Sequence, residues 1–361
     1  MPGPGPPGAD ILRPRHVLAE DSLRAFVTAL PKAELHVHLE GSIPPELALR
    51  LAARHGVRLP GDEAGAQGVR EAFRFVDFGR FIRVYLALSR CLQTVDDLRD
   101  VVVALAQRLR AQGVVHAEVT FTPMTHAVRG VSEEVIMEGL MQGRELAATI
   151  GVSILYVLDI VRSYADQAEP TLGFALRLRQ RLAGGVAGLG LAGPEGGDHP
   201  LGPMVDVFAR ARAAGLRSLP HAGEFLGASS VRAAIDRLGA DRIGHGVRAI
   251  EEPSLIEELA RRQIPLEVCP SSNVALGVFP DLARHPLPQL IAAGVAVSLA
   301  TDDPALFGVD LVDEYLRCAS QFGWSVDRLR ALAQASLRHA SVDEDTRRSW
   351  LAAAAAVPDP E

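Results

Sequence analysis

The chain of 361 residues is 48% hydrophobic and 22% charged, the balance of a globular protein that can bury a large core. Its net charge of −7 and its lack of any run of Lys or Arg exclude a basic surface for nucleic acid. It has no apolar stretch of about 18 residues and no Cys-X-X-Cys pair among its three cysteines, so we expect a reduced, cytoplasmic protein without a membrane span.

The first segment, residues 1–20, begins with repeated Pro and Gly and lacks the apolar core of a signal peptide, so we expect a disordered leader. A strand is predicted next, ending in the sequence LHVHLEG, which contains His36 and His38. Because side chains alternate along a strand, these two imidazoles point to the same face and form half of a candidate metal site.

A mainly helical stretch is predicted between this strand and the next one. Helices are expected over residues 46–54 and over residues 94–113, the second beginning at an N-cap threonine. Between them, Phe78, Phe81 and Tyr85 follow one another at helical spacing. We interpret this aromatic face as packing on the body of the protein rather than contacting a ligand.

From residue 114 onward, apolar runs of strand length alternate with helical segments. The predicted strands are 114–122, 152–160, 186–191, 216–220, 241–244, 265–269 and 295–299. The predicted helices are 133–150, 167–182, 203–214, 229–238, 253–262 and 287–293. With the strand before His36 this makes eight βα units, which favour a parallel (β/α)8 TIM barrel of the α/β class with a helical insertion between strands 1 and 2.

A doubly wound open sheet is the alternative fold. No G-x-G-x-x-G sequence follows the first strand, which weakens that alternative. No internal repeat or linker divides residues 21–356, so we expect them to form a single domain.

Polar side chains gather at the predicted carboxyl ends of the strands, where a barrel of this kind carries its chemistry. Each has an ordinary explanation when taken alone, such as a core histidine or the N-cap of a helix. Their joint placement at successive strand ends is what indicates a functional site. The residues are His36, His38, Glu195, His221, Glu224, His245, Asp302 and Asp303.

The chemistry that fits this set is metal-assisted hydrolysis. Three neutral imidazoles and one carboxylate suit Zn²⁺ better than Mg²⁺ or Ca²⁺, which prefer oxygen ligands. Zinc would lower the pKa of a bound water from about 15.7 to about 7. Glu224, three residues after His221, is the candidate general acid, and His245 would orient the attacking hydroxide. Asp302 would hold the metal while Asp303 accepts a hydrogen bond from the substrate.

Six motifs in this order resemble the adenosine deaminase family of the amidohydrolase superfamily: PKAELHVHLEGS, GLGLAGPE, PHAGE, RIGHGV, CPSSN and TDDP. The resemblance covers residues 30–350. It implies a zinc-dependent enzyme with one Zn²⁺ per chain. The ligands that it implies are His36, His38, His221 and Asp302.

The same resemblance assigns roles toward a 6-aminopurine. Glu224 would protonate ring nitrogen N1 as water adds to C6, and His245 would position and help to deprotonate that water. Asp303 would bond N7, and the backbone N–H of Gly193 would bond N3, while His38 and Glu40 face the substrate. Ammonia would then leave.

The implied substrate is a small molecule, a nucleoside of the adenosine type that gives an inosine-type product. Two other substrates remain open, adenine and 6-aminodeoxyfutalosine, because Glu40 stands where adenosine-specific members usually carry Asp. Gly190 replaces an Asp that many of those members show in strand 4. Neither a nucleic-acid nor a membrane partner is expected, and the oligomeric state is left open.

Two other functional classes are weighed against a deaminase. A binuclear ester or amide hydrolase of the same superfamily would require a carboxylated lysine on strand 4, but Lys32 is the only lysine in the chain. An inactive purine-binding protein would have lost a metal ligand or the acid Glu224, and all of these are present. His116, His126 and His199 are interpreted as peripheral to the site.

Overall fold

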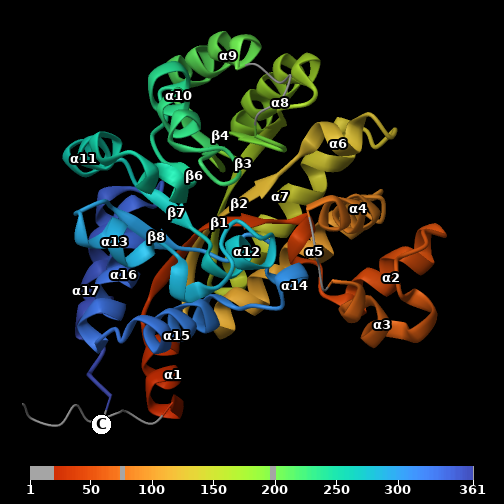
Figure 1. The fold of residues 1–361 in the computed structure, drawn as a ribbon. Coiled ribbons are helices and arrows are strands. Elements are labelled where there is room, and N and C mark those ends of the chain that lie inside the picture. The colour runs from red at the N-terminus through yellow and green to blue at the C-terminus, as the bar shows by residue number, and fades with distance from the viewer. Residues whose placement is uncertain (1–19, 74–77, 196–200, 361) are drawn as a thin grey trace, which may run out of the picture.

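The computed structural model describes residues 20–73, 78–195 and 201–360. Eight parallel strands surround a central axis, each hydrogen-bonded to the next in chain order (Figure 1). They are β1 (Lys32–His38), β2 (Val114–Phe121), β3 (Ser153–Val161), β4 (Val186–Ala192), β5 (Arg217–Ala222), β6 (Ile243–His245), β7 (Leu266–Val268) and β8 (Val297–Leu299). The predicted leader lies outside the described residues except for Glu20.

Backbone hydrogen bonds complete the circle between the first strand and the last. His38 N donates to Asp302 O at 2.8 Å, and Asp302 N donates to His36 O at 3.0 Å. These bonds join β1 to the segment that follows β8. The expected (β/α)8 barrel is confirmed, and the open-sheet alternative is wrong.

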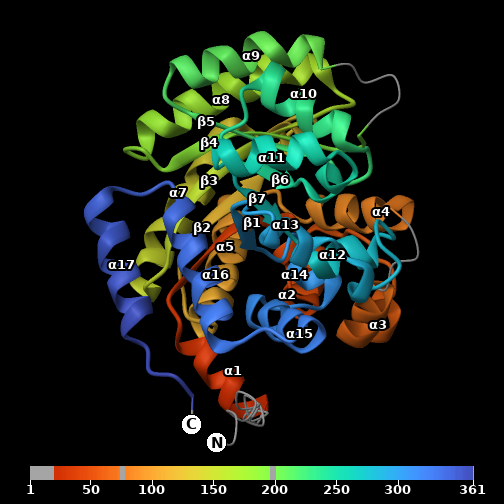
Figure 2. The ribbon, with the colours of Figure 1, turned by 60° about the vertical axis from the view of Figure 1, so that its left-hand side comes forward.

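Helices ring the barrel, with α8, α9 and α10 at the top of the view in Figure 2 and α1 at the bottom. The helix α16 packs against both β1 and β8 and covers the place where the barrel closes. The α-helices before β5 are α1 (Glu20–Ala29), α2 (Pro45–His55), α3 (Gly65–Ala72), α4 (Phe78–Ser89), α5 (Val95–Ala111), α6 (Pro123–Ala127), α7 (Glu133–Ile150), α8 (Ala168–Arg181) and α9 (Gly202–Ala213). Those after β5 are α10 (Ala228–Leu238), α11 (Pro253–Arg262), α12 (Pro270–Ala275), α13 (Leu287–Ala292), α14 (Pro304–Phe307), α15 (Leu311–Phe322), α16 (Val326–His339) and α17 (Glu344–Ala356).

The predicted insertion between β1 and β2 consists of α2, α3 and α4, followed by α5 (Figure 1). Thr94 begins α5 with a capping box, in which its side chain and that of Asp97 each accept a bond from the other's backbone N–H. In the part of the chain that the structure describes, the helices are too short or too polar to cross a membrane.

Local rules account for most boundaries, and the exceptions have identifiable causes. The strand β7 is shorter than predicted because Pro265 has no N–H to donate and Cys269 already caps α12. All seven residues of β1 are buried, including its polar ones, because the strand is covered on both faces. Polar side chains are therefore carried into the interior, where they need partners or a function.

Candidate active site

The ends of β1 and β5 and the segment after β8 bring their polar side chains to one buried point. Asp302 Oδ1 lies 3.4 Å from His36 Nε2 and 3.3 Å from His38 Nε2. His38 Nε2 in turn lies 3.2 Å from His221 Nε2. Ligand atoms about 2.0–2.2 Å from a tetrahedral zinc are about 3.3–3.6 Å apart. Three of the distances among the four expected ligand atoms are therefore close to those around one such ion.

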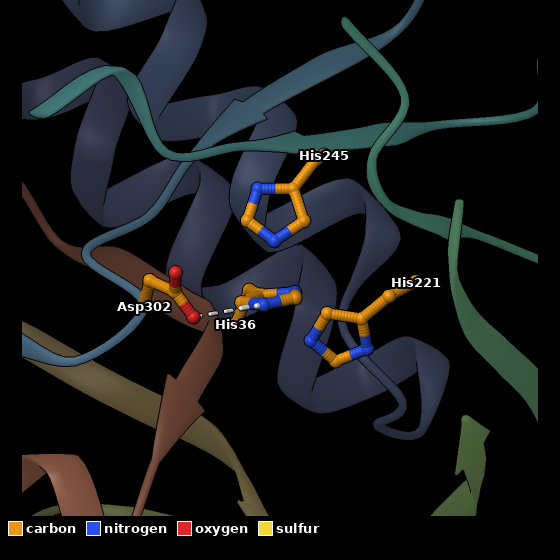
Figure 3. Close-up of side chains that lie close together, drawn as sticks. All are labelled: His36, His221, His245 and Asp302. Atoms are coloured by element: carbon orange, nitrogen blue, oxygen red, sulfur yellow. Dashed lines mark ion pairs between the residues drawn. The ribbon is translucent and has the colours of Figure 1, made fainter. Parts of the chain in front are cut away.

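His245, at the end of β6, lies close enough to compete for a place in this set. His36, His221, His245 and Asp302 each offer one atom within 4.8 Å of the others (Figure 3). This group contains His245 instead of His38, which forms its own groups at this distance with Asp159 and His221 and with Asp302 and Asp303. The hydrogen bonds of His245 decide whether its ring could bind a metal.

The protons on His245 follow from a chain of hydrogen bonds behind it. Leu287 N donates to His285 Nδ1 at 3.2 Å, so a neutral His285 donates its Nε2–H to Asn273 Oδ1, also at 3.2 Å. Asn273 Nδ2 then donates to His245 Nδ1 at 3.3 Å. Burial lowers the pKa of both histidines to about 4, so both rings are neutral. The network assigns the remaining proton of His245 to Nε2, which offers no lone pair to a metal.

In His36 the hydrogen bonds place a proton on Nδ1, whereas in His245 they place it on Nε2. Its Nδ1 lies 3.0 Å from Glu267 Oε2, and Arg242 Nε donates to Glu267 Oε1 at 2.5 Å. Although burial opposes ionisation, Arg242 lowers the pKa of Glu267, so this carboxylate accepts the Nδ1–H of His36. His36 Nε2 is buried and lacks a hydrogen-bond partner among the described residues. Although burial opposes it, Asp302 and Glu267 raise the pKa of His36 well above its usual range, so a metal at Nε2 would take the place of a proton.

Asp302 is held with one oxygen toward the histidines. Ser272 Oγ donates to Asp302 Oδ2 at 2.6 Å, which leaves Oδ1 to face His36 and His38. Asp302 has a left-handed backbone (φ +64°), a strained conformation that the hydrogen bonds closing the barrel hold in place. Burial opposes its charge, but His36 and His38 keep the pKa of Asp302 well below its usual range. The site thus carries a negative charge where a cation would sit.

A cavity of about 290 Å³ opens from these groups toward α4. Glu224, Asp303 and Gly193 line its polar part, as expected for residues that contact a substrate. The rest of the wall is largely apolar and includes Phe78, Phe81, Ile82, Tyr85, Leu86, Phe225 and Leu276. The aromatic face of α4 packs on the core, as expected, and it also lines this cavity.

Two carboxyl groups in the cavity retain their protons more strongly than usual. Burial, assisted by the negative charge of Asp302, raises the pKa of Glu224 and of Asp303 well above the ordinary values. Glu224 Oε2 lies 3.7 Å from His245 Nε2. A protonated carboxyl can donate a hydrogen bond or a proton, so each of the two can serve acceptor atoms on a substrate.

Glu195 holds the turn that carries Glu224, a role that the sequence did not reveal. Its carboxylate accepts hydrogen bonds from four consecutive backbone N–H groups, those of residues 223–226, at 2.6 to 2.9 Å. Ser230 Oγ donates a fifth bond at 2.6 Å. Glu195 lies in the GLGLAGPE motif just after β4, so the segments following β4 and β5 are fastened together.

Glu40 is buried in the short helix η1 (Glu40–Ser42) and already has partners. His126 Nε2 lies 3.0 Å from Glu40 Oε1, and Thr122 N donates to the same oxygen at 3.4 Å. Neither His126 nor Glu40 is among the described residues that line the cavity, so His126 supports Glu40 from a peripheral position. His116 lies at the opposite end of β2 beside Ser153, away from the cavity. His199 lies outside the described residues.

Comparisons with known proteins agree with this geometry. A family model described as "Adenosine deaminase" matches residues 31–356. A Streptomyces coelicolor protein named "Adenine deaminase" is 41% identical over 329 residues, covering 90% of this chain and 94% of its own. An "Aminodeoxyfutalosine deaminase" of Streptomyces avermitilis is 39% identical over 324 residues and covers 89% of each chain.

Solved structures show the same similarity. The crystal structure of an adenine deaminase from Arthrobacter aurescens has a TM-score of 0.84 and 35% identity, covering 91% of this chain and 98% of that one. An amidohydrolase from Burkholderia ambifaria, crystallised with bound Zn, has a TM-score of 0.85 and 30% identity, and the match covers 95% of this chain and 94% of that one.

Proposed function

Because the chain belongs to the adenosine deaminase family, hydrolases that act on the C–N bond of a cyclic amidine, we propose that it is a zinc-dependent deaminase of a 6-aminopurine. The observation that carries this proposal is the meeting of three imidazoles and Asp302 Oδ1 beside Glu224, a carboxyl group that keeps its proton, in one cavity. Together these groups offer a metal site and a general acid on the same side of a barrel.

The ligands that we propose for a single Zn²⁺ are His36, His38, His221 and Asp302. Three of the distances among their ligand atoms, 3.2 to 3.4 Å, are close to those around a tetrahedral ion, and the donor set of nitrogen and carboxylate oxygen suits zinc. His245 is left out because its Nε2 carries a proton. The zinc-bound amidohydrolase relative supports the choice of metal. When bound, the ion would supply a water of lowered pKa.

The chain's own residues would bind the purine and move its protons. Glu224 would donate to N1, which makes C6 more reactive toward water, and Asp303 would donate to N7. Gly193, with its left-handed backbone (φ +90°) on the segment after β4, would offer its N–H to N3. His245 Nε2–H would orient the attacking water as a donor. Deprotonation of that water by His245, which we first expected, would require the other tautomer.

We propose adenine as the first candidate substrate. The relatives named adenine deaminase support it, and Glu40 is not among the described residues that line the cavity, while its Oε1 is bound by His126 and Thr122. These observations favour adenine over adenosine, which was our first expectation. The described residues that line the cavity include no Lys or Arg, which argues against a phosphorylated nucleotide.

Aminodeoxyfutalosine is the second candidate. The relative of that name supports it, and so do the apolar residues that line the cavity. Beyond its polar part the cavity continues along Phe78 and Phe81 to Leu86, which is 37% exposed, so a substituent on the purine has an apolar path toward solvent.

Ammonia release from four separate substrates tests this proposal: adenine, aminodeoxyfutalosine, adenosine and 2′-deoxyadenosine. We expect turnover of adenine or aminodeoxyfutalosine to exceed that of the two nucleosides, and a chelator to abolish it. Failure to turn over any of the four, or full activity after removal of the metal, would contradict the proposal.

A further inference from the structure

The space beside Gly190 on β4 is filled by a side chain from the neighbouring strand. Gly190 pairs directly with Asp159 of β3 in the barrel. A Cβ atom on Gly190 would lie 1.8 Å from Asp159 Oδ1, so the two strands cannot both place a side chain there. A carboxylate is therefore present at this level of the barrel, but β3 supplies it rather than β4.

The Asp159 carboxylate has no partner that accounts for its burial. The residue is 1% exposed, and both of its oxygens lack a hydrogen bond among the described residues. An unpaired carboxylate in the interior costs free energy, so its presence calls for an explanation. Arg162, a nearby cation, donates from Nη2 to the backbone carbonyl of His221, and its buried Nε has no hydrogen-bond partner among the described residues.

Asp159 lies within 4.8 Å of two histidines of the proposed metal site, His38 and His221. Asp159 Oδ2 lies 4.0 Å from His221 Nδ1, which is also buried and without a partner. This distance is too long for a hydrogen bond, but a small rotation of either side chain would form one. The opposite nitrogen, His221 Nε2, points to His38 Nε2 and the proposed metal position.

We infer that Asp159 is the positioning residue of His221. It accepts the Nδ1–H and so keeps the lone pair of Nε2 directed at the metal, as Glu267 does for His36. The inference rests on the proposed function, because it assigns His221 Nε2 to zinc. It also explains why Gly190 is tolerated on β4, since the carboxylate that orients His221 reaches it from β3.

Zinc affinity, measured by competition with a chromophoric chelator, tests this inference in the intact chain. We expect Asp159→Ala to bind zinc roughly 10–100-fold more weakly than the wild type while still binding one ion at saturation. Asp159→Asn keeps the shape but offers a neutral acceptor, so it should also bind zinc more weakly. The double variant Asp159→Ala/Gly190→Asp should regain affinity, because it returns a carboxylate to the same space from β4.

The melting temperature of the metal-free protein separates this role from a structural one. If Asp159 served only the fold, Asp159→Asn would lower that temperature. If it positions His221, its buried carboxyl group costs the fold free energy that Asp159→Asn relieves, so the metal-free protein should melt no lower while its zinc affinity falls. Asp159→Asn also decides the matter if Asp159→Ala fails to fold.

Three outcomes would overturn the inference. Unchanged zinc affinity in both single variants would show that Asp159 does not act on the site. Complete loss of zinc binding in a folded Asp159→Asn would make Asp159 a ligand instead of a positioning residue. A wild type that binds no zinc would overturn the proposed function itself, and this inference with it.

Discussion

Glu224 and Asp303 show how burial prepares single residues for chemistry. An exposed carboxyl group is ionised at neutral pH and can only accept hydrogen bonds. Inside the cavity, burial and the charge of Asp302 raise the pKa of both groups, so they retain protons that they can donate. N1 and N7 of a 6-aminopurine that is substituted or protonated at N9 are acceptors, so two protonated acids match them where two carboxylates would repel them.

Replacement of Glu224 by Gln tests the proposed role of this single residue as the general acid. The amide has nearly the same size but no transferable proton, so we expect kcat to fall by roughly 10²–10⁴-fold. Zinc content, measured on the same preparation, should stay at the wild-type level because Glu224 is not among the proposed ligands. Wild-type turnover in Glu224→Gln would refute its assignment as the acid.

At the scale of elements, the segments after β4 and β5 act as one unit. Glu195 follows β4, and its carboxylate binds the backbone of residues 223–226, which follow β5. Gly193, on the first segment, and Glu224, on the second, would contact different atoms of the same purine. The Glu195 carboxylate therefore sets the distance between two groups that must reach one substrate together.

Glu195→Ala should lower kcat by roughly 10²-fold, because a catalytic group displaced by about 1 Å can slow the reaction by about that factor. The free turn would leave Glu224 poorly aligned while the zinc content stays unchanged. Steady-state kinetics with metal analysis measures both. Ser230→Ala is the matched control, since it removes one of the five bonds to Glu195 and should change kcat little. Equal kcat values for Glu195→Ala and the wild type would contradict this role.

The sequence was most informative about elements whose causes are local. Strand and helix periodicity, the capping box at Thr94 and the histidine pair of β1 all depend on residues near one another in the chain. The barrel and the grouping of polar residues at its carboxyl rim were therefore predictable. Once the barrel is assumed, the strand order itself brings His36 and His221 to the same end.

What the sequence could not predict are contacts between distant segments. Asp159 fills the space beside Gly190 only because β3 and β4 pair in one particular register. The proton on His245 depends on a chain through Asn273 and His285. A motif identifies such residues as present but does not say which atoms face each other, and the direction of each hydrogen bond decides their roles.

At the scale of the whole molecule, a buried ion network links the site to the opposite end of the barrel. Arg242 Nε donates to Glu267, the carboxylate that also binds His36. Arg242 Nη2 donates to Glu118 Oε2 at 2.6 Å. Glu118 Oε1 in turn accepts from Ser341 N at 2.6 Å, in the segment between α16 and α17. The network therefore connects the last two helices with a proposed metal ligand through the interior.

Arg242→Met should destabilise the fold by about 3–5 kcal/mol, because it leaves two buried carboxylates without their cation. Urea unfolding of the metal-free protein measures this loss. Arg232→Met is the matched control, since Arg232 pairs with Glu252 and Glu258 on the surface, where solvent screens the charges. A control that loses as much stability as Arg242→Met would refute the special role of the buried network.

Glu314, on α15, makes the stability of the whole molecule depend on pH. It is buried, and burial raises its pKa to about 7, although Ser271 N donates to its Oε1 at 3.0 Å. The unfolded chain releases this proton near pH 4.5, whereas the folded protein keeps it to about pH 7. The folded state thus holds the extra proton between these values, so Glu314 lowers the free energy of unfolding as the pH rises from 4.5 to 7.

Glu314→Gln should remove this dependence, because the amide keeps an acceptor for Ser271 N and does not ionise. The shift from 4.5 to about 7 corresponds to roughly 3 kcal/mol, which Glu314→Gln should gain relative to the wild type between pH 5 and pH 8. Urea unfolding of both proteins at pH 5, 6, 7 and 8 gives the two slopes. Because the comparison is between slopes, a constant packing loss in Glu314→Gln would not obscure the result. Parallel slopes would mean that Glu314 does not titrate in this range.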